Sequence, residues 1–348
     1  MQNLRIGIVG CGGMSLSHTL AMTRLTGVSV AAVAEPKKAN RDRYIRFSTR
    51  DIERRMATDR SFRKAVEKAR KLTADCVQYT RYERMLEREP LDAVLILTPH
   101  TLHHGQILDA LEAGLHVLVE KPMVCTTRHA EDVVTAARKS GKVVGVAYQR
   151  HFEPDYLYMR EAAQSGKLGR LEYISLVLYQ NWYSPTKGTW RRSPKWAGGG
   201  QLLDSGSHVI DAILWVSGLK ARRVFATMRR FDARVDVDSA LIIEFANGAI
   251  GQVTIVGKTI MPFSEELVIT GAAGVLQYRQ GCLYHYDVGG KKTTPEVVRR
   301  SKSTPVVNFV DAIRGRAPVG APPECGLAAA RVTDAAFRSA KRGCFVNV

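Results

Sequence analysis

The sequence predicts an α/β protein with two domains. Residues 1–148 are expected to form a doubly wound parallel sheet, because short apolar strands alternate with helical segments as far as Tyr148. Residues 149–348 are expected to form a second α/β domain with a large, mostly antiparallel sheet and a C-terminal helix. In that half, apolar or alternating runs are separated by turn signals such as Asn247-Gly248 and Gly289-Gly290.

Composition limits the class of protein. The 348 residues are 45% hydrophobic and 24% charged, which is typical of globular domains with substantial cores. No apolar run is long enough to span a membrane, and no signal-peptide core follows Met1. The six cysteines are scattered without a Cys-x-x-Cys pair, which argues against a zinc site or a disulfide framework. We therefore expect a cytoplasmic protein without a metal site or a membrane contact.

The net charge is strongly positive, +18 from 51 Lys/Arg and 33 Asp/Glu, which favours association with anionic partners. Half of this excess lies in a basic helical insertion at residues 37–71, where 14 Lys/Arg face five acidic residues. One interpretation is a patch for nucleic acid or another polyanion. The alternative is a solvated helical excursion that could pack against another subunit. The second is favoured over nucleic-acid binding because few aromatic residues are interleaved with the charges.

The first motif follows the strand Leu4–Val9. It reads Gly10-Cys11-Gly12-Gly13-Met14-Ser15 and leads into a helix expected to end near Gly27. A strand, a glycine-rich turn and a helix are the context in which such glycines bind a dinucleotide. Gly10 would permit the tight turn, and Gly12 would let the backbone approach a pyrophosphate at the helix N-terminus. Ser15 stands where Gly or Ala is usual.

A second strand, Val28–Ala34, ends at Glu35. The spacing in the sequence between the glycine turn and Glu35 is typical of an acidic residue that hydrogen-bonds the adenosine ribose hydroxyls. A carboxylate repels a 2′-phosphate, so the sequence favours NAD. Lys37, Lys38 and Arg41 could offset that repulsion, which leaves NADP possible.

The remaining elements of the first half are short strands and helices, expected at 76–79, 82–87, 91–97, 102–113, 117–119, 128–139 and 143–148. Two of these strands end in polar residues. One is followed by Thr98-Pro99-His100 and the other by Glu120-Lys121-Pro122, at the sheet edge where ligands bind. The alternative is a solvent-facing Lys121 with Glu120 as its surface partner.

In the second half we expect strands at 171–180, 221–228, 239–245, 249–256, 266–270 and 275–278, then a helix at 327–341 and a short terminal strand. If residues from about Leu203 are helical, Asp204, His208 and Asp211 share one face. A histidine near a carboxylate suits proton exchange at neutral pH. The alternative is that Asp204 caps the helix and His208 is a satisfied buried histidine.

Aromatic and cationic residues cluster upstream of that motif, at Trp182, Tyr183, Trp190, Arg191 and Trp196. Such a cluster suits stacking on, and hydrogen bonding to, a polyhydroxylated ring. Packing at a rim or a subunit interface is the alternative.

Three motifs together, Gly10–Ser15, Glu120-Lys121-Pro122 and Asp204-x-Gly206-x-His208-x-x-Asp211, resemble the Gfo/Idh/MocA family of glucose-fructose and inositol-type oxidoreductases. The likeness spans nearly the whole chain. It implies a Rossmann domain followed by an α/β domain whose open sheet is used for oligomerisation, here a homodimer or homotetramer. It also implies that Lys121 lies by the nicotinamide and the reacting carbon, often beside a cis proline. His208 would be the acid/base on the substrate hydroxyl, and Asp204 would help to hold that hydroxyl.

The expected activity is hydride transfer between NAD(P) and a secondary hydroxyl or ketone of a sugar, sugar derivative or cyclitol. Alternatives are a redox-neutral epimerase or glycoside-cleaving enzyme that retains NAD, and a non-catalytic dinucleotide sensor or nucleic-acid-binding protein. The expected catalytic residues are Lys121, His208 and Asp204. Residues expected to bind the cofactor are Gly10, Gly12, Gly13, Met14, Glu35, Thr98, Pro99, His103, Glu120 and Lys121. Residues expected to bind the substrate are Arg150, Trp190, Arg191, Asp204 and His208.

Overall fold

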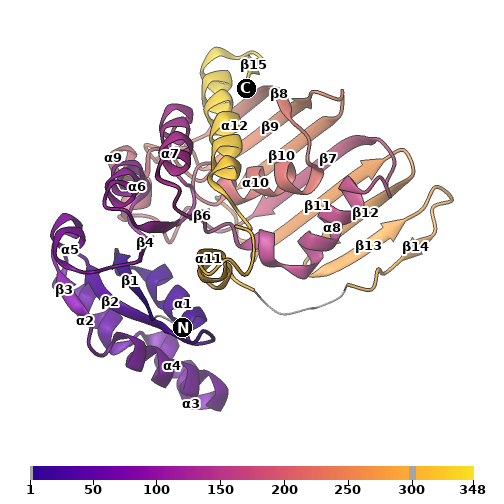
Figure 1. The fold of residues 1–348 in the computed structure, drawn as a ribbon. Helices are drawn as coiled ribbons and strands as arrows, with labels where there is room; N and C mark the ends of the chain where they lie inside the picture. The colour runs from indigo at the N-terminus through magenta and orange to yellow at the C-terminus, as the bar shows by residue number, and fades with distance from the viewer. Residues whose placement is uncertain (1–2, 298–302) are drawn as a thin grey trace.

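The computed structural model describes residues 3–297 and 303–348, and two sheets organise them (Figure 1). In the first sheet the strand order is β3-β2-β1-β4-β5-β6 and every pairing is parallel. The strands are β1 Leu4–Val9, β2 Val28–Ala34, β3 Val77–Tyr79, β4 Ala93–Ile96, β5 His116–Val119 and β6 Val144–Val146. The order reverses between β1 and β4, and ligands bind at the carboxyl ends of strands at such a reversal.

The helices of this half are α1 Gly13–Met22, α2 Lys38–Arg46, α3 Arg50–Thr58, α4 Arg60–Thr73, α5 Tyr82–Arg88, α6 His103–Glu112 and α7 Thr127–Ser140, with a short 3₁₀ turn η1 at His100–Leu102. Helix α1 is shorter than expected. The backbone N–H groups of Thr23, Arg24 and Leu25 donate to carbonyls three residues back, so the chain tightens there and does not continue towards Gly27.

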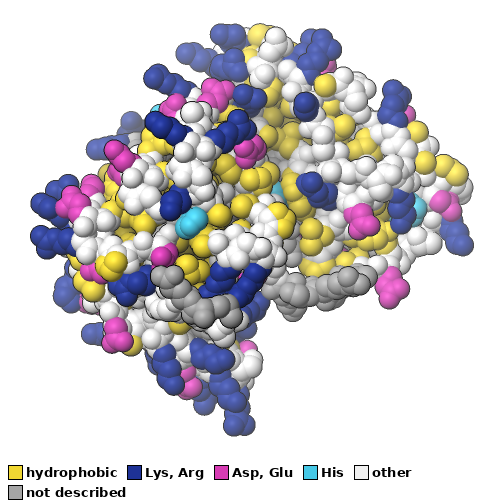
Figure 2. Space-filling model, viewed as in Figure 1, with side chains coloured by type: hydrophobic (Ala, Val, Ile, Leu, Met, Phe, Trp, Pro, Cys, Tyr) yellow, Lys and Arg dark blue, Asp and Glu magenta, His cyan; other side chains and the backbone are white. Residues whose placement is uncertain are grey.

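The basic segment forms α2, α3 and α4 on the outside of the first sheet. Its apolar residues, including Tyr44, Phe47 and Val66, join the core beneath β1 and β2. Most of its Lys and Arg side chains are exposed, and they gather at the lower end of the view in Figure 2. Two cations depart from this pattern, because Arg41 and Arg43 donate to the backbone carbonyls of Glu35 and Cys11.

In the second sheet, the described strands follow the order β14-β13-β12-β11-β7-β10-β9-β8-β15. Only the β7–β10 pairing is parallel, so the predicted mostly antiparallel sheet and the fold class are confirmed. The strands are β7 Leu171–Tyr179, β8 Ala221–Arg229, β9 Asp238–Phe245, β10 Ile250–Val256, β11 Ser264–Gly271, β12 Gly274–Arg279, β13 Cys282–Tyr286, β14 Lys292–Thr293 and β15 Val346–Asn347. Strands β13 and β14, which are short and only partly buried or exposed, have no counterpart among the strands expected from the sequence.

Helices cover one face of this sheet (Figure 1). They are α8 Pro154–Gln164, α10 Gly206–Ser217 and α12 Pro323–Arg342, with short turns η2 Gln149–Phe152, η3 Trp190–Arg192 and α9 Pro194–Ala197 nearby. Alternate residues Ile174, Leu176 and Leu178 of β7 are buried under them. The opposite face carries exposed side chains such as Ile242 and Ile250, and its use for oligomerisation remains a prediction.

One helix of the second half returns to the first sheet. Helix α11, Pro305–Ile313, packs against α1, β5 and β6, and its Phe309 joins the core of the first half. Among the described residues, no helix combines the length and hydropathy that crossing a membrane requires.

Candidate active site

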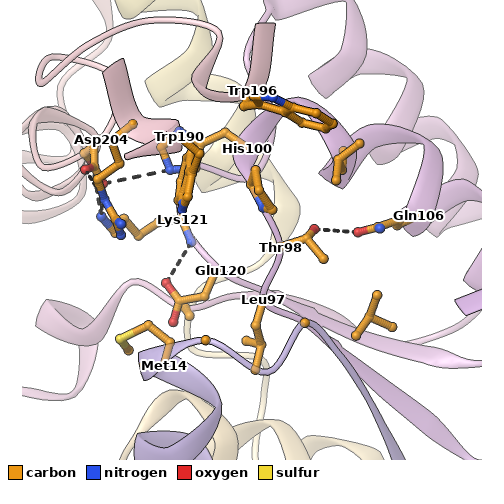
Figure 3. A pocket seen from close by; sticks show the side chains of 18 of the residues that line it. Met14, Leu97, Thr98, His100, Gln106, Glu120, Lys121, Trp190, Trp196 and Asp204 are labelled. Carbon is orange, nitrogen blue, oxygen red and sulfur yellow. Dashed lines mark hydrogen bonds and ion pairs between the residues drawn. The ribbon is translucent and has the colours of Figure 1, made fainter. Parts of the chain in front are cut away.

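A cavity of about 1050 Å³ lies where the carboxyl ends of the parallel strands meet the second half of the chain. Its walls come from the β1–α1 turn, the ends of β2, β4, β5 and β7, and the turns η2 and η3. Figure 3 shows Met14, Leu97 and Glu120 on one side of it and Trp190 and Trp196 on the other. The cavity is therefore built jointly by the two sheets.

The glycine turn forms one wall of the cavity. Gly10 has φ +94°, and a Cβ there would meet the carbonyl oxygen of Leu97 at 2.8 Å. By contrast, a Cβ on Gly12 or Gly13 would meet nothing within 4 Å, and both residues line the cavity. Ser15 is buried and its hydroxyl donates to the carbonyl of Gly12 at 2.6 Å, so the departure from Gly or Ala is accommodated inside the turn.

Glu35 lies at the end of β2, next to this turn. Its carboxylate accepts from the N–H of Cys11 at 3.1 Å and from the N–H of Lys37 at 3.0 Å. Glu35 and Lys37 both line the cavity. An open glycine backbone at a helix N-terminus, with a carboxylate at the end of the next strand, fits a dinucleotide.

The side chains of Lys121 and Asp204 form an ion pair in the wall of the cavity. Lys121, which precedes a cis peptide bond to Pro122, places its Nζ 2.9 Å from Oδ1 of Asp204 and 3.2 Å from the carbonyl oxygen of Asp204. The other carboxylate oxygen accepts from Trp182 Nε1 and from Arg191 Nε, each at 2.9 Å. Asp204 thus gathers side chains from both halves of the chain.

Electrostatics keep this carboxylate charged. Burial by itself would raise the pKa of Asp204, but the charges of Lys121 and Arg191 and the Trp182 hydrogen bond lower it far below its usual value. His100 Nε2 lies 3.8 Å from the carboxylate, yet burial lowers the pKa of His100 to about 3. His100 is therefore a neutral neighbour and not an ion-pair partner.

Glu120 is not the surface partner of Lys121. Its side chain is buried and pairs with His18 of α1, Oε1 to Nε2 at 2.8 Å, and it accepts from the backbone N–H of Lys121 at 3.2 Å. Burial tends to raise the pKa of Glu120, but His18 and Lys121 together, through their hydrogen bonds and charges, lower that pKa below its usual value. Glu120 lines the cavity and ties the end of β5 to α1.

The expectation that Asp204, His208 and Asp211 share one face of a helix is wrong. Helix α10 begins only at Gly206, with Ser205 as its N-cap, so Asp204 lies in the preceding turn and does not cap the helix with its side chain. The buried carboxylate of Asp236 accepts from the N–H groups of Gly200 and Leu202, which fixes that turn.

The three residues separate accordingly. Asp211 points away from the cavity and bonds to His151, Oδ2 to Nε2 at 2.8 Å. His208 lines the cavity, and its Nδ1 has no hydrogen-bond partner among the described residues. Burial, then the charges of Lys121 and Arg150, lower the pKa of His208 well below its usual value. The imidazole is therefore neutral, and it is not the satisfied core histidine of the alternative interpretation.

The other predicted site residues divide into two groups. Those that line the cavity are Gly10, Gly12, Gly13, Met14, Glu35, Thr98, Pro99, Glu120, Arg150, Trp190 and Arg191. His103 does not line it, because its ring nitrogens bond to the carbonyls of Thr98 and Pro122, each at 2.9 Å. His103 instead connects the two strand ends that carry the site. Trp190 lies against Arg191 and edge-on to His100.

Two residues that line the cavity, Gln180 and Phe263, were not singled out from the sequence, whereas Trp196 of the aromatic cluster does line it. Gln180 had a detectable signal. It continues the alternate, inward-facing positions of Leu176 and Leu178, so it is a polar residue in an apolar row. Phe263 lies in an irregular segment just before β11, where no periodicity indicates its direction.

Family comparisons agree with this geometry. Residues 4–148 match the model described as an oxidoreductase family with an NAD-binding Rossmann fold, and residues 156–277 match a GFO/IDH/MocA C-terminal domain. The rhizopine catabolism protein MocA of Rhizobium meliloti is 26% identical over 97% of this chain and 95% of its own length. Inositol 2-dehydrogenase 4 of Saccharopolyspora erythraea is 28% identical over 73% of this chain and 67% of its own length.

A solved structure shows the same fold. Levoglucosan dehydrogenase, in a complex with NADH, superposes with a TM-score of 0.81 at 21% identity, covering 100% of this chain and 99% of that chain. The fold, including the second sheet, is thus shared over the whole length of both chains.

Two glycine substitutions separate folding from cofactor binding. Gly10→Ala should lower the free energy of unfolding by about 1–3 kcal/mol, because of the positive φ and the contact with Leu97. Gly12→Ala meets open space and should change that free energy by less than about 0.5 kcal/mol, while weakening NADH binding at least about tenfold. Denaturant unfolding and quenching of protein fluorescence by NADH measure the two effects. Equal NADH affinity in Gly12→Ala and wild type would contradict the assignment of this turn.

Asp204→Asn tests the charge balance of the site. The variant keeps the shape but leaves Lys121 and Arg191 without their carboxylate, so unfolding should become easier by roughly 2–4 kcal/mol. Glu244→Gln is a matched control, because its partner Arg223 lies at the surface and an exposed pair contributes only about 0–1 kcal/mol. Similar unfolding midpoints for the two variants would contradict a central role for Asp204.

Proposed function

The chain belongs to the Gfo/Idh/MocA oxidoreductase family, and we propose that it is an NAD-dependent dehydrogenase of a ring hydroxyl in a sugar, sugar derivative or cyclitol. The observation that carries the proposal is the convergence of Lys121 and His208 in the cavity that the glycine turn and Glu35 also line. An ammonium and a neutral imidazole beside one reacting oxygen are what alcohol oxidation requires of a protein.

The roles of the two side chains follow from their charges. Bound NAD supplies the hydride acceptor. Lys121 donates a hydrogen bond to the substrate oxygen and stabilises negative charge as it develops there. His208 is neutral with a free Nδ1, so it can take the hydroxyl proton during oxidation and return it during reduction.

Asp204 is assigned a positioning role in this scheme. Three of its hydrogen-bonding directions are already filled by Lys121, Trp182 and Arg191. It therefore holds the ammonium of Lys121 in place. Any contact with the substrate hydroxyl would be secondary.

The adenosine end supports NAD over NADP. Glu35 presents its carboxylate at the end of β2, and a carboxylate there repels a 2′-phosphate. Two nearby cations use part of their donors on the backbone, since Arg41 and Arg43 donate to the carbonyls of Glu35 and Cys11. Lys37 and Arg81 also line the cavity and are the cations that would oppose Glu35.

A turnover assay tests the proposal. Purified protein is mixed with NAD or NADP and with myo-inositol, D-glucose or methyl glucosides, and reduced nicotinamide is followed by absorbance. We expect steady formation of NADH with at least one ring substrate and lower kcat/KM with NADP. Lys121→Ala and His208→Ala should each lower kcat about 10²–10⁴-fold, the range for loss of a general acid/base.

Controls in the same assay are Lys139→Ala and His129→Ala, on α7 and outside the cavity, which should retain wild-type rates. Turnover that survives in Lys121→Ala would contradict the role of that residue. NAD that co-purifies without net NADH formation would indicate redox-neutral chemistry instead.

The pH profile tests the state of His208. Since its pKa lies well below the usual value of 6.5, the imidazole stays neutral as the pH falls through 6.5. At saturating NAD, kcat/KM for oxidation should therefore be flat from about pH 8 to pH 6 and decline only in more acidic solution. In His208→Gln the residual rate should lack this acidic decline. If instead the wild-type rate falls to half near pH 6.5–7, and this pH dependence disappears in His208→Gln, then the pKa of His208 is not shifted.

A further inference from the structure

The inward face of the second sheet changes from apolar to polar at the cavity. On β7 the buried row Ile174, Leu176 and Leu178 is followed by Gln180, and on β11 the row Ile269 and Leu267 ends in the buried Glu265. Glu265 pairs in register with Leu178, so Gln180 and Glu265 occupy the same end of neighbouring strands. Polar residues here interrupt a face that otherwise packs against helices.

Arg150 of η2 meets this polar end. Its guanidinium is buried and donates Nε to Glu265 Oε1 at 2.9 Å and Nη2 to Glu265 Oε2, while the hydroxyl of Tyr156 also donates to Glu265. Burial disfavours the cation, but Glu265 raises the pKa of Arg150 above its usual value, and the two side chains form an ion pair. The pair is neutral as a unit.

Three buried atoms around this pair have no hydrogen-bond partner among the described residues. They are Nη1 of Arg150, Oε1 of Gln180 and Nδ1 of His208, and all three residues line the cavity. Buried polar atoms in proteins are nearly always hydrogen-bonded, and leaving one unpaired is costly. Unpaired atoms on three separate elements of one cavity therefore indicate a place for a polar ligand group.

We propose that Arg150 and Gln180 form a specificity subsite that holds a neutral hydroxyl of the ring substrate, beside the oxygen handled by Lys121 and His208. A hydroxyl can accept from Nη1 of Arg150 and donate to the Gln180 amide at once, whereas an ether or carbonyl oxygen can only accept. This inference rests on the proposed function and names the substrate class further.

The charge of the pair excludes an acidic group at this position. Glu265 already neutralises Arg150, so a substrate carboxylate here would add an uncompensated negative charge to a buried site. The subsite should therefore select a neutral polyhydroxylated ring over the corresponding ring acid. Arg150 acts here as a hydrogen-bond donor of fixed direction, not as a counter-charge.

Gln180→Leu tests the subsite, with myo-inositol, its monodeoxy derivatives, D-glucose and D-glucuronate as probes. Each probe is assayed for NADH formation, and its binding to NADH-saturated protein is measured by saturation-transfer NMR. We expect KM or Kd for the preferred neutral ring to rise about tenfold, with kcat changed less than threefold. One monodeoxy derivative should bind wild type and Gln180→Leu equally, because it lacks the hydroxyl in question. Wild type should prefer D-glucose to D-glucuronate.

The controls isolate the subsite from the fold and from the cofactor. Gln252→Leu changes the same residue type on the outward face of β10 and should leave all constants unchanged. Arg150→Lys keeps a positive charge beside Glu265 but removes the planar set of guanidinium N–H donors. The variant should therefore fold, and its KM or Kd should rise for the same hydroxyl as in Gln180→Leu. NADH affinity should stay constant in every variant.

The possible results distinguish this inference from the proposed function. Unchanged KM or Kd in Gln180→Leu, or a loss confined to NADH affinity, would overturn the subsite while leaving the dehydrogenase intact. Preference for D-glucuronate over D-glucose would overturn the neutral character of the subsite. If wild type forms no NADH with any probe, the proposed function fails, and the binding measurements alone then decide whether Gln180 selects a hydroxyl.

Discussion

The buried carboxylate of Asp204 is the interaction on which the rest of the site depends. It is one of the few groups that touch both halves of the chain directly, through Lys121 at the end of β5 and through Trp182 and Arg191 in the second half. A charge in this position is tolerated only because cations and an indole N–H surround it. The position of the ammonium relative to the cavity therefore follows from the packing of the two sheets.

The same principle recurs at other strand ends. Parallel and antiparallel strands bury apolar residues along most of their length and place polar residues where they leave the core. Glu120 follows β5, Glu35 follows β2, and Gln180 follows β7, and each of these side chains faces the same cavity. The ring of His103 lies between the carbonyls of Thr98 and Pro122, 2.9 Å from each, so the ends of β4 and β5 are also held together. The site is thus formed by the ends of several strands, which the packing of the chain holds in fixed positions relative to one another.

Local signals explain which parts were predictable from sequence. The strands of the first sheet, the glycine turn and the Glu120–Pro122 segment depend on periodicity and on residues adjacent in the chain, and they were identified within a few residues. The surroundings of Asp204 were not, because Asp236 fixes the turn before α10 from a distant position in the sequence. The partner of Glu120 is likewise distant, since His18 lies on α1. Neither the spacing of residues nor their helix and strand propensity predicts these contacts.

Charge balance separates the cavity into two regions with different consequences for a ligand. Around Asp204, two cations share one carboxylate, so an ammonium that is not fully neutralised by Asp204 stands where an alkoxide would form in the proposed reaction. Around Arg150, one cation faces one carboxylate, so that region contributes direction and no net charge. A substrate oxygen that gains negative charge is therefore stabilised at the first region, whereas an oxygen that stays neutral suits the second. On the proposed function, this arrangement would orient a ring with several similar hydroxyls, because only one of them can become charged at low cost.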